Sequence, residues 1–352
     1  MDTHIESCLH AIQIQNSFSY GRMEVIPLFS SQDAGPEYLT LGQALAQNRI
    51  LITEVSTQGA VPQLKVVNKG KTPILLLDGE EIAGAKQNRV LNTSIIVPGE
   101  SEIEIPVSCT EHGRWAYSSP HFHDSRVMMD YKIRARKMAS VSRSLKHMEC
   151  RASDQVEIWD EISEMSKKAK VSSPTSAMKD VFDSKVDDMN RYLDAFPIQP
   201  GQQGVIIYLD SRPAGIEFLS RPEAYARVHD KLIRSYVMEA LIDEGPPASP
   251  PEKPEHAQEF LKRIAACNAE SYTAVGLGTE FRLEGKDIIG SALVHEGVVV
   301  HLACFTEHTG ESPYGHERMA GYRARRSSHA ARGEEMHRSG RGPNRPGDTY
   351  VW

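Results

Sequence analysis

Residues 75–90 of the chain read LLLDGEEIAGAKQNRV, an apolar run that changes abruptly into a block of charges and amides. The apolar start belongs to a predicted strand, Ile74–Leu77, and the block ends where a second predicted strand, Val90–Val97, begins. Asp78 and Gly79 form a typical turn signal between them. The stretch therefore predicts two strands of a β-rich region with an ionisable segment between them.

Short strand patterns continue on both sides of this stretch. From Tyr38 to Val107 the sequence alternates or runs apolar over β-branched residues, with turn signals between the runs. Even spacing of this kind is typical of a β-sandwich or a small barrel. We predict a β-rich domain over residues 38–125, with a short helix within residues 39–46 and further strands at Ile50–Val55, Leu64–Val67 and Glu102–Val107.

The pattern becomes helical after residue 125. Asp154 is a helix cap ahead of apolar residues at helical spacing, and Ser173-Pro174 is the signature of another helix start. We predict a helical section over residues 126–200. Its first part, residues 126–147, is strongly basic, with seven lysines or arginines.

A third section, residues 201–305, mixes strands and helices. It starts and ends with hairpin patterns, and a capping box at Ser220 opens a helix that runs to about Leu241. The predicted fold class is therefore α+β: an N-terminal β-sandwich or small β-barrel, a helical middle section, and a C-terminal mixed α/β section with antiparallel hairpins. Residues 1–37 precede these sections, and residues 306–352 form an Arg-rich tail with the composition of a disordered segment.

Charge and cysteine content are typical of a soluble intracellular protein. The net charge is −7, yet residues 318–345 hold eight arginines against Glu334 and Glu335, so the body is acidic and the tail basic. None of the five cysteines stands in a CxxC pair, an arrangement that suits reduced thiols. No apolar run approaches the ~20 residues of a membrane helix, and the first residues lack the pattern of a secretory signal. We predict a cytoplasmic protein.

The block after the turn combines groups that bind metals and phosphates. Its three carboxylates can hold a divalent metal such as Mg²⁺ through oxygen ligands, and either glutamate can act as a general base. Its lysine and arginine can bind phosphate, with the amides as further contacts. The alternative is that the turn is an ordinary hairpin and the charges form its solvated rim. The candidate residues are Asp78, Glu80, Glu81, Lys86, Gln87, Asn88 and Arg89.

A second polar cluster follows the last of these strands, from Cys109 to Trp115. Cys109 and His112 suggest a nucleophilic thiol, but three residues apart on an extended chain they point to opposite faces. Arg114 and Trp115 fit better as an anion contact and a stacking surface for a ring. The alternative is that Trp115 packs against the helical section.

Other ionisable patterns have simpler explanations. His121 and His123 share a face of an extended chain, as metal ligands can, but no third ligand follows at a recognisable spacing. His301 lies in an apolar strand, where a lone histidine is usually a core residue with satisfied hydrogen bonds. A solvated ion-pair network is predicted for one face of the helix after Ser220, formed by Asp230, Lys231 and Arg234.

With these residues in view, the chain resembles the ARG and rhodanese–phosphatase-superfamily-associated protein family, in which ARG stands for ADP-ribosylglycohydrolase. The likeness covers about residues 38–305 and is most specific over residues 75–90. It extends to Asn92-Thr93, Gly113-Arg-Trp115 and Val300-His-Leu302. The resemblance implies an association with enzymes that handle ADP-ribose and other NAD-derived nucleotides. It implies no particular reaction and no catalytic residue.

Three functional hypotheses are compatible with these patterns. The first is an intracellular protein that binds a phosphorylated nucleotide derived from ADP-ribose or NAD, and that hydrolyses or transfers it if it is an enzyme. The second is a non-catalytic ligand sensor or protein-interaction adaptor, which accounts for the absence of a recognised nucleophile motif. The third is nucleic-acid association through the arginine tail and residues 126–147, which the acidic body disfavours.

Overall fold

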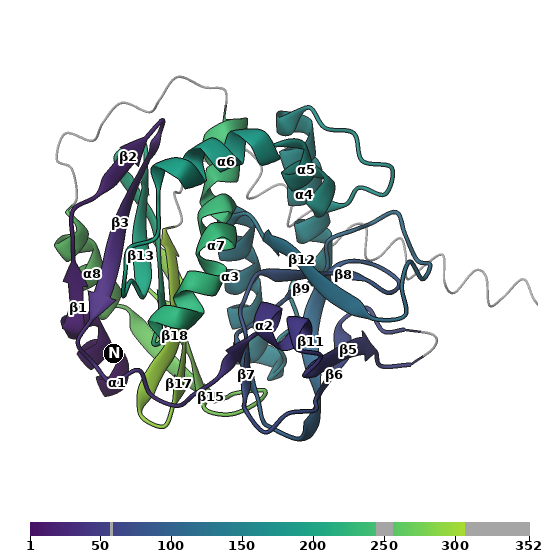
Figure 1. The fold of residues 1–352 in the computed structure, drawn as a ribbon, viewed down its shortest axis with the longest axis horizontal. Helices are drawn as coiled ribbons and strands as arrows, with labels where there is room; N and C mark the ends of the chain where they lie inside the picture. Colours follow the sequence, from purple (N-terminus) through teal and green to yellow (C-terminus); the bar gives the residue numbers. More distant parts are fainter. Residues whose placement is uncertain (57–58, 244–255, 307–352) are drawn as a thin grey trace, which may run out of the picture. The chain divides into compact units, whose positions relative to one another are not determined.

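The chain is an α+β protein, as predicted. The structure is a computed structural model that describes residues 1–56, 59–243 and 256–306 (Figure 1). Within these residues, eight helices and 18 strands follow one another, and the strands form three sheets. The Arg-rich tail predicted from the sequence lies outside the described residues from residue 307 onward.

The largest sheet has nine strands and combines the two ends of the described chain. β3 (Met23–Ser30) pairs antiparallel with β13 (Gly204–Leu209), so the first residues are built into the sheet of the C-terminal section. Both strands are apolar on both faces because each face packs on its own core. The strand order is β1 (Ile12–Ile14), β3, β13, β14 (Arg212–Leu219), β18 (Val298–Thr306), β17 (Ile288–His295), β16 (Thr279–Glu284) and β15 (Asn268–Thr273), with β2 (Phe18–Tyr20) also paired to β3.

Helices cover both faces of this sheet. α1 (Thr3–Ala11) and α8 (Ala257–Ala265) pack on one face, and α3 (Tyr131–Met148) and α7 (Pro222–Ile242) pack on the other. The hairpin predicted at the end of the section is confirmed, since β17 and β18 pair through a turn at Glu296 and Gly297. Both turn residues have positive φ, which is typical of tight hairpins.

The β-rich region forms two further sheets that share one core. A six-stranded sheet curls into a half-barrel, so that its two edge strands come into contact. A three-stranded sheet and α2 (Leu41–Ala46) close its open side, with Leu41 and Leu76 packed among the inward side chains of the half-barrel. The half-barrel order is β12 (Phe122–Met128), β8 (Glu80–Gly84), β9 (Arg89–Leu91), β11 (Ser101–Cys109), β6 (Gln63–Asn68) and β5 (Ile50–Glu54), and the small sheet is β10 (Ile95–Val97), β7 (Ile74–Leu76) and β4 (Leu39–Thr40).

The prediction of one strand from Val90 to Val97 is wrong, because the chain changes sheets within it. β9 pairs with β8 and β11, whereas β10 pairs with β7. Between them the Thr93 hydroxyl donates to Glu280 of β16 at 2.7 Å, and the Ser94 hydroxyl lies 2.8 Å from the His301 ring of β18. These polar side chains hold the connection against the nine-stranded sheet, and the strand is interrupted there.

The turn at Asp78-Gly79 is not the hairpin that the sequence suggested. The strand before it, β7, belongs to the small sheet, and the strand after it, β8, belongs to the half-barrel. Gly79 has a φ of +84°, and a Cβ atom there would lie 2.3 Å from Nε of Arg134. Asp78 and Gly79 therefore form a buried crossing between two sheets, at a position where a side chain on residue 79 would collide with α3.

Two of the predicted helix starts are wrong and one is confirmed. Asp154 caps α4 (Gln155–Ala169) by accepting from the backbone of Val156 and Glu157, as predicted. Pro174 precedes its helix instead of starting it, because α5 (Met178–Ser184) begins four residues later and the Ser173 hydroxyl binds Asp180. α6 (Val186–Ala195) follows α5.

The predicted capping box at Ser220 does not form. α7 begins at Pro222, its N-cap is Arg221, and no side chain caps it. The Ser220 hydroxyl instead lies 3.3 Å from the Tyr38 hydroxyl. Proline at the first helical position is sufficient to start the helix, because its fixed φ suits that position.

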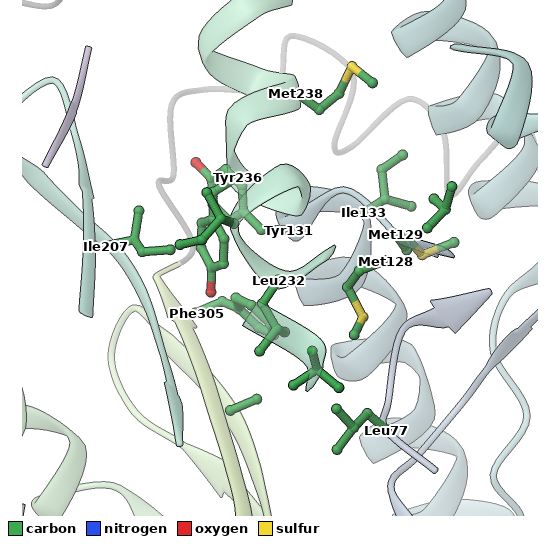
Figure 2. Close-up of a cluster of buried hydrophobic side chains, with 14 of the residues drawn as sticks. Leu77, Met128, Met129, Tyr131, Ile133, Ile207, Leu232, Tyr236, Met238 and Phe305 are labelled. Carbon is green, nitrogen blue, oxygen red and sulfur yellow. The ribbon is translucent and has the colours of Figure 1, made fainter. Parts of the chain in front are cut away.

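One apolar core joins the helices to the two large sheets. Figure 2 shows Leu232 and Tyr236 of α7 beside Phe305 of β18 and Ile207 of β13, with Leu77 in the same cluster. α7 contacts both β14 of the large sheet and β12 of the half-barrel. Its interior residues are therefore the main apolar connection between the two β structures.

We predict that Leu232→Ala lowers the free energy of unfolding by about 2–5 kcal/mol, because Leu232 is fully buried at this junction. Chemical denaturation monitored by circular dichroism measures the change. Val156→Ala is the control, since Val156 is exposed on α4 and its loss should cost less than about 0.5 kcal/mol. A cost for Leu232→Ala no larger than that of the control would contradict the assignment of this core.

Candidate functional site

The three carboxylates of the 75–90 block lie apart, each with its own partner. Asp78 forms a buried ion pair with Lys137 of α3, whose Nζ also donates to the Leu91 carbonyl at 2.8 Å. Glu80 forms an ion pair with Lys231 of α7 at 2.5 Å and accepts from the backbone N–H of Leu77 at 2.7 Å. The block is buried and is no solvated rim.

Glu81 points to the opposite face of β8, because side chains alternate along a strand. There it is fully buried and accepts from the Thr110 hydroxyl at 2.6 Å. Burial raises the pKa of Glu81 to about 7, with the Thr110 hydrogen bond opposing the shift. Burial thus brings the pKa of Glu81 into the neutral range.

The metal site expected from Asp78, Glu80 and Glu81 requires side chains that converge, and these do not. Within residues 1–56, 59–243 and 256–306, no group of three or more His, Cys, Asp or Glu side chains is arranged to hold a metal ion. His121 precedes β12 and His123 lies within it, and both residues are exposed. The geometry of the donors gives no basis for a divalent metal at the block.

Lys231 differs from its prediction as part of a solvated helix network. It is buried, and besides Glu80 it lies 3.5 Å from Asp124 of β12. Arg234 turns away and donates to Asn190 at 2.9 Å. A cavity of about 260 Å³ lies beside Lys231 and Asp124, between α2 and α7.

A second buried polar group ties the half-barrel to the large sheet. Arg134 of α3 pairs with Glu217 of β14 at 2.5 Å, and Glu217 lies 3.5 Å from Nε2 of His301. Nδ1 of His301 is 2.8 Å from the Ser94 hydroxyl, which accepts from the Asp78 N–H at 2.9 Å. Burial alone would raise the pKa of Glu217, but Arg134 and His301 outweigh it and the pKa is lowered. His301 is therefore a buried core residue, as predicted, but of its two ring nitrogens only Nδ1 has a hydrogen-bond partner among the described residues.

The second half of the block leads to one end of the half-barrel. Arg89 begins β9 and is the register partner of Cys109 at the end of β11, and Glu54 is the last inward residue of β5. Lys86 lies in the β8–β9 turn, and Trp115 follows β11. We call this group of five residues the barrel mouth.

Arg89 is the most unusual residue of the barrel mouth. Its side chain is fully buried, and Nη1 donates to the Gln87 side chain at 3.2 Å and to the Asn88 carbonyl at 3.4 Å. Nε and Nη2 have no hydrogen-bond partner among the described residues, and Nη2 lies 3.9 Å from Oε1 of Glu54. Burial lowers the pKa of Arg89 from its ordinary value, although the guanidinium stays charged at neutral pH.

Two exposed aromatic rings lie over the cations of the mouth. Nζ of Lys86 is 5.2 Å from the centroid of the Trp115 ring and 5.3 Å from that of Tyr117, and the Arg89 guanidinium carbon is 5.7 Å from the Trp115 centroid. Trp115 is 47% exposed and Tyr117 is 51% exposed. Trp115 is thus a surface ring above buried cations and is not packed into the helical section.

Arg114 holds the loops of the mouth together. Its guanidinium donates to Glu111 at 2.6 and 2.9 Å, to the Ala85 carbonyl at 2.7 Å and to the Asn88 side chain at 3.2 Å. Asn88 also accepts from the N–H of Gly84. Both residues, expected as ligand contacts, therefore have their hydrogen-bonding groups occupied inside the protein.

Cys109 and His112 do not form a nucleophilic pair. Cys109 is buried beside Arg89, and burial raises the pKa of its thiol to about 11. The His112 ring packs against Trp159, with ring centroids 4.3 Å apart. The thiol stays protonated near neutral pH and has no histidine to activate it.

Comparisons with known proteins agree with the motif residues. The family model described as ARG and Rhodanese-Phosphatase-superfamily-associated Protein domain matches residues 11–305. The chain belongs to this family. No match was found among curated proteins or among solved structures. Among the described helices of this family member, none is both long and apolar enough to cross a membrane.

The family match includes β1 and β3, which sequence patterns alone did not assign, and it also includes two site residues that sequence reasoning missed. Glu54 was detectable, since Ile50, Ile52 and Glu54 alternate on the inward face of one strand. Tyr117 had no signal, because its position over Lys86 depends on the course of a loop.

We predict that the protein becomes less stable as Glu81 ionises. The folded pKa of about 7 lies above the ordinary 4.5, so the native state holds the proton more tightly. The contribution of Glu81 to the free energy of unfolding is fully present below pH 4.5 and is lost as the pH rises to 7. Each unit of difference between the folded and unfolded pKa corresponds to about 1.4 kcal/mol. Denaturation of the wild type and of Glu81→Gln at pH 5 and pH 8 measures it. The free energy of unfolding of the variant, relative to that of the wild type, should be higher at pH 8 than at pH 5. The same difference between variant and wild type at both pH values would refute the assignment.

Proposed function

We propose that the protein binds a phosphorylated ligand with a heterocyclic ring, of the ADP-ribose or NAD-derived class, at the barrel mouth. The observation that carries the proposal is Arg89, a buried guanidinium with two nitrogens that lack hydrogen-bond partners among the described residues. A buried donor without a partner costs about 1–3 kcal/mol, more when it is charged. A fold retains such a group most readily where a ligand supplies the missing acceptors.

A phosphate matches what Arg89 lacks. A guanidinium can donate two parallel hydrogen bonds to phosphate oxygens, and Nε with Nη2 forms one such edge. Lys86 and Arg89 bring two positive charges to the mouth against the one negative charge of Glu54. The local excess is one positive charge in an acidic protein, which favours an anionic ligand at this place.

The exposed rings account for the second part of the ligand. Trp115 and Tyr117 present about half of their surfaces to solvent directly above Lys86. Stacking a nucleobase or nicotinamide on such a ring contributes about 1–3 kcal/mol. Phosphate on Arg89 and a ring on Trp115 together describe a nucleotide.

The family gives this chemistry its context. The family is named for its association with ARG and rhodanese–phosphatase superfamily proteins, and the initials ARG stand for ADP-ribosylglycohydrolase. The activity that we propose is binding. Glu80 is held by Lys231, and Glu81 lies on the face of β8 opposite to the mouth, so neither is placed to act as a base on a ligand at Arg89.

Association with nucleic acid receives less support from the described residues. Most of the basic segment of residues 126–147 lies in α3, and most of its cations are ion-paired within the protein. These cations are Lys132, Arg134, Arg136, Lys137 and Lys146, paired with Glu239, Glu217, Glu161, Asp78 and Glu270. Phosphate binding by α3 would require these pairs to break.

Calorimetric titration of ADP-ribose, NAD and AMP into the full chain tests the proposal. Binding of at least one of them is expected, and Arg89→Gln should weaken it about 10–100-fold, since a hydrogen bond to a charged group contributes about 1.5–3 kcal/mol. Trp115→Ala should weaken it through loss of stacking.

The matched controls are Arg143→Gln, which removes an exposed cation of α3, and Met148→Ala, which removes an exposed apolar side chain. Neither should change the affinity. No binding at millimolar concentration, or equal affinity in all four variants, would exclude the barrel mouth as the nucleotide site.

A further inference from the structure

Glu54 is a second buried group of the barrel mouth whose hydrogen bonding is incomplete. Its side chain is nearly fully buried, and Oε1 accepts the backbone N–H of Lys86 at 3.3 Å. Oε2 has no hydrogen-bond partner among the described residues. A buried carboxylate oxygen in this state accepts a hydrogen-bond donor readily.

Other buried carboxylates, such as Glu80 and Glu217, also have one oxygen without a hydrogen-bond partner, but each of them has a cation at closer range. Glu80 lies 2.5 Å from Lys231, and Glu217 lies 2.5 Å from Arg134. Glu54 and Arg89, although both are buried, remain 3.9 Å apart, beyond hydrogen-bond distance. The ion pairs of Glu80 and Glu217 are therefore within hydrogen-bond distance, whereas the pair of Glu54 and Arg89 is not.

The curvature of the half-barrel explains the separation. Glu54 ends β5, Arg89 begins β9, and β6 and β11 lie between these strands in the sheet. The two side chains face each other across the curled sheet, so backbone positions on separate strands set the distance between them. Nε and Nη2 of Arg89 and Oε2 of Glu54 keep no hydrogen-bond partner among the described residues.

Gly59 lies close to Glu54, Lys86 and Trp115. A Cβ atom on Gly59 would lie 3.1 Å from Cδ of Lys86, 3.3 Å from Cζ2 of Trp115 and 3.4 Å from Oε2 of Glu54. Its φ of +77° also suits glycine. Gly59 thus packs close to the carboxylate of Glu54, the stem of Lys86 and the ring edge of Trp115.

We propose that Glu54 recognises the hydroxyl groups of a ribose and makes the barrel mouth selective for ribonucleoside phosphates. The inference rests on the proposed binding of a nucleotide at this mouth. Arg89 supplies donors for the phosphate, and Trp115 supplies a surface for the base. Glu54 supplies the acceptor, because a carboxylate accepts the hydroxyl pair of a ribose, as acidic residues do in dinucleotide-binding folds.

A comparison of AMP with 2′,3′-dideoxy-AMP tests the assignment by calorimetry on the full chain. The wild type should bind AMP about tenfold or more tightly than the dideoxy compound, since the latter leaves the carboxylate without donors. Glu54→Gln should reduce the affinity for AMP and leave that for the dideoxy compound nearly unchanged, so that the preference disappears. Glu104→Gln, the same change at an exposed position of β11, should keep the preference.

The possible outcomes separate this inference from the proposed function. If the wild type binds both compounds equally while Arg89→Gln weakens both, the nucleotide site stands and the role of Glu54 is overturned. If Glu54→Gln weakens both compounds equally, its selectivity is also overturned. If neither compound binds the wild type, both proposals fail. The wild-type comparison decides the matter even if Glu54→Gln proves unstable, which its melting temperature would reveal.

Discussion

The buried ion pair between Lys137 and Asp78 is the interaction on which the arrangement of the β structures depends. Asp78 lies where the chain leaves the three-stranded sheet for the half-barrel, and Lys137 reaches it from α3. The same ammonium donates to the carbonyl of Leu91, at the end of β9. Losing one partner of such a pair typically costs about 3–5 kcal/mol, because the other charge remains buried. One lysine therefore fixes the crossing, the strand end and the helix together.

This crossing determines how the charged block is used. Once Asp78 is directed at α3, Glu80 faces α7 and Glu81 faces Thr110, so the acidic half of the block serves the structure. After β8 the chain turns at the end of the half-barrel, and Lys86 and Arg89 enter the mouth there. The motif thus has two parts, which the strand β8 separates. The acidic part serves the structure, and the basic part is the one that we propose for a ligand.

Local patterns made much of the fold predictable, and long-range contacts account for what was missed. The α+β class, the strands near residues 50–107, the Asp154 cap and the last hairpin follow from alternation, periodicity and turn chemistry within a few residues. The break between β9 and β10 depends on Glu280 and His301, almost 200 residues away. The block itself was recognisable as special. Its carboxylates were misread because Lys137 and Lys231 lie on helices whose docking no local pattern reveals.

The distance between buried opposite charges separates the structural ion pairs of this molecule from the barrel mouth. Buried polar groups in a folded protein normally have partners, since an unmet one is costly. Several buried groups of the described residues keep one polar atom without a hydrogen-bond partner, but Glu80 has Lys231 2.5 Å away. Arg89 and Glu54 both keep unpartnered atoms and stay 3.9 Å apart, beneath exposed aromatic rings. Two opposite charges held 3.9 Å apart by the sheet leave open donors on Arg89 and an open acceptor on Glu54, and this is the basis on which we propose a ligand there.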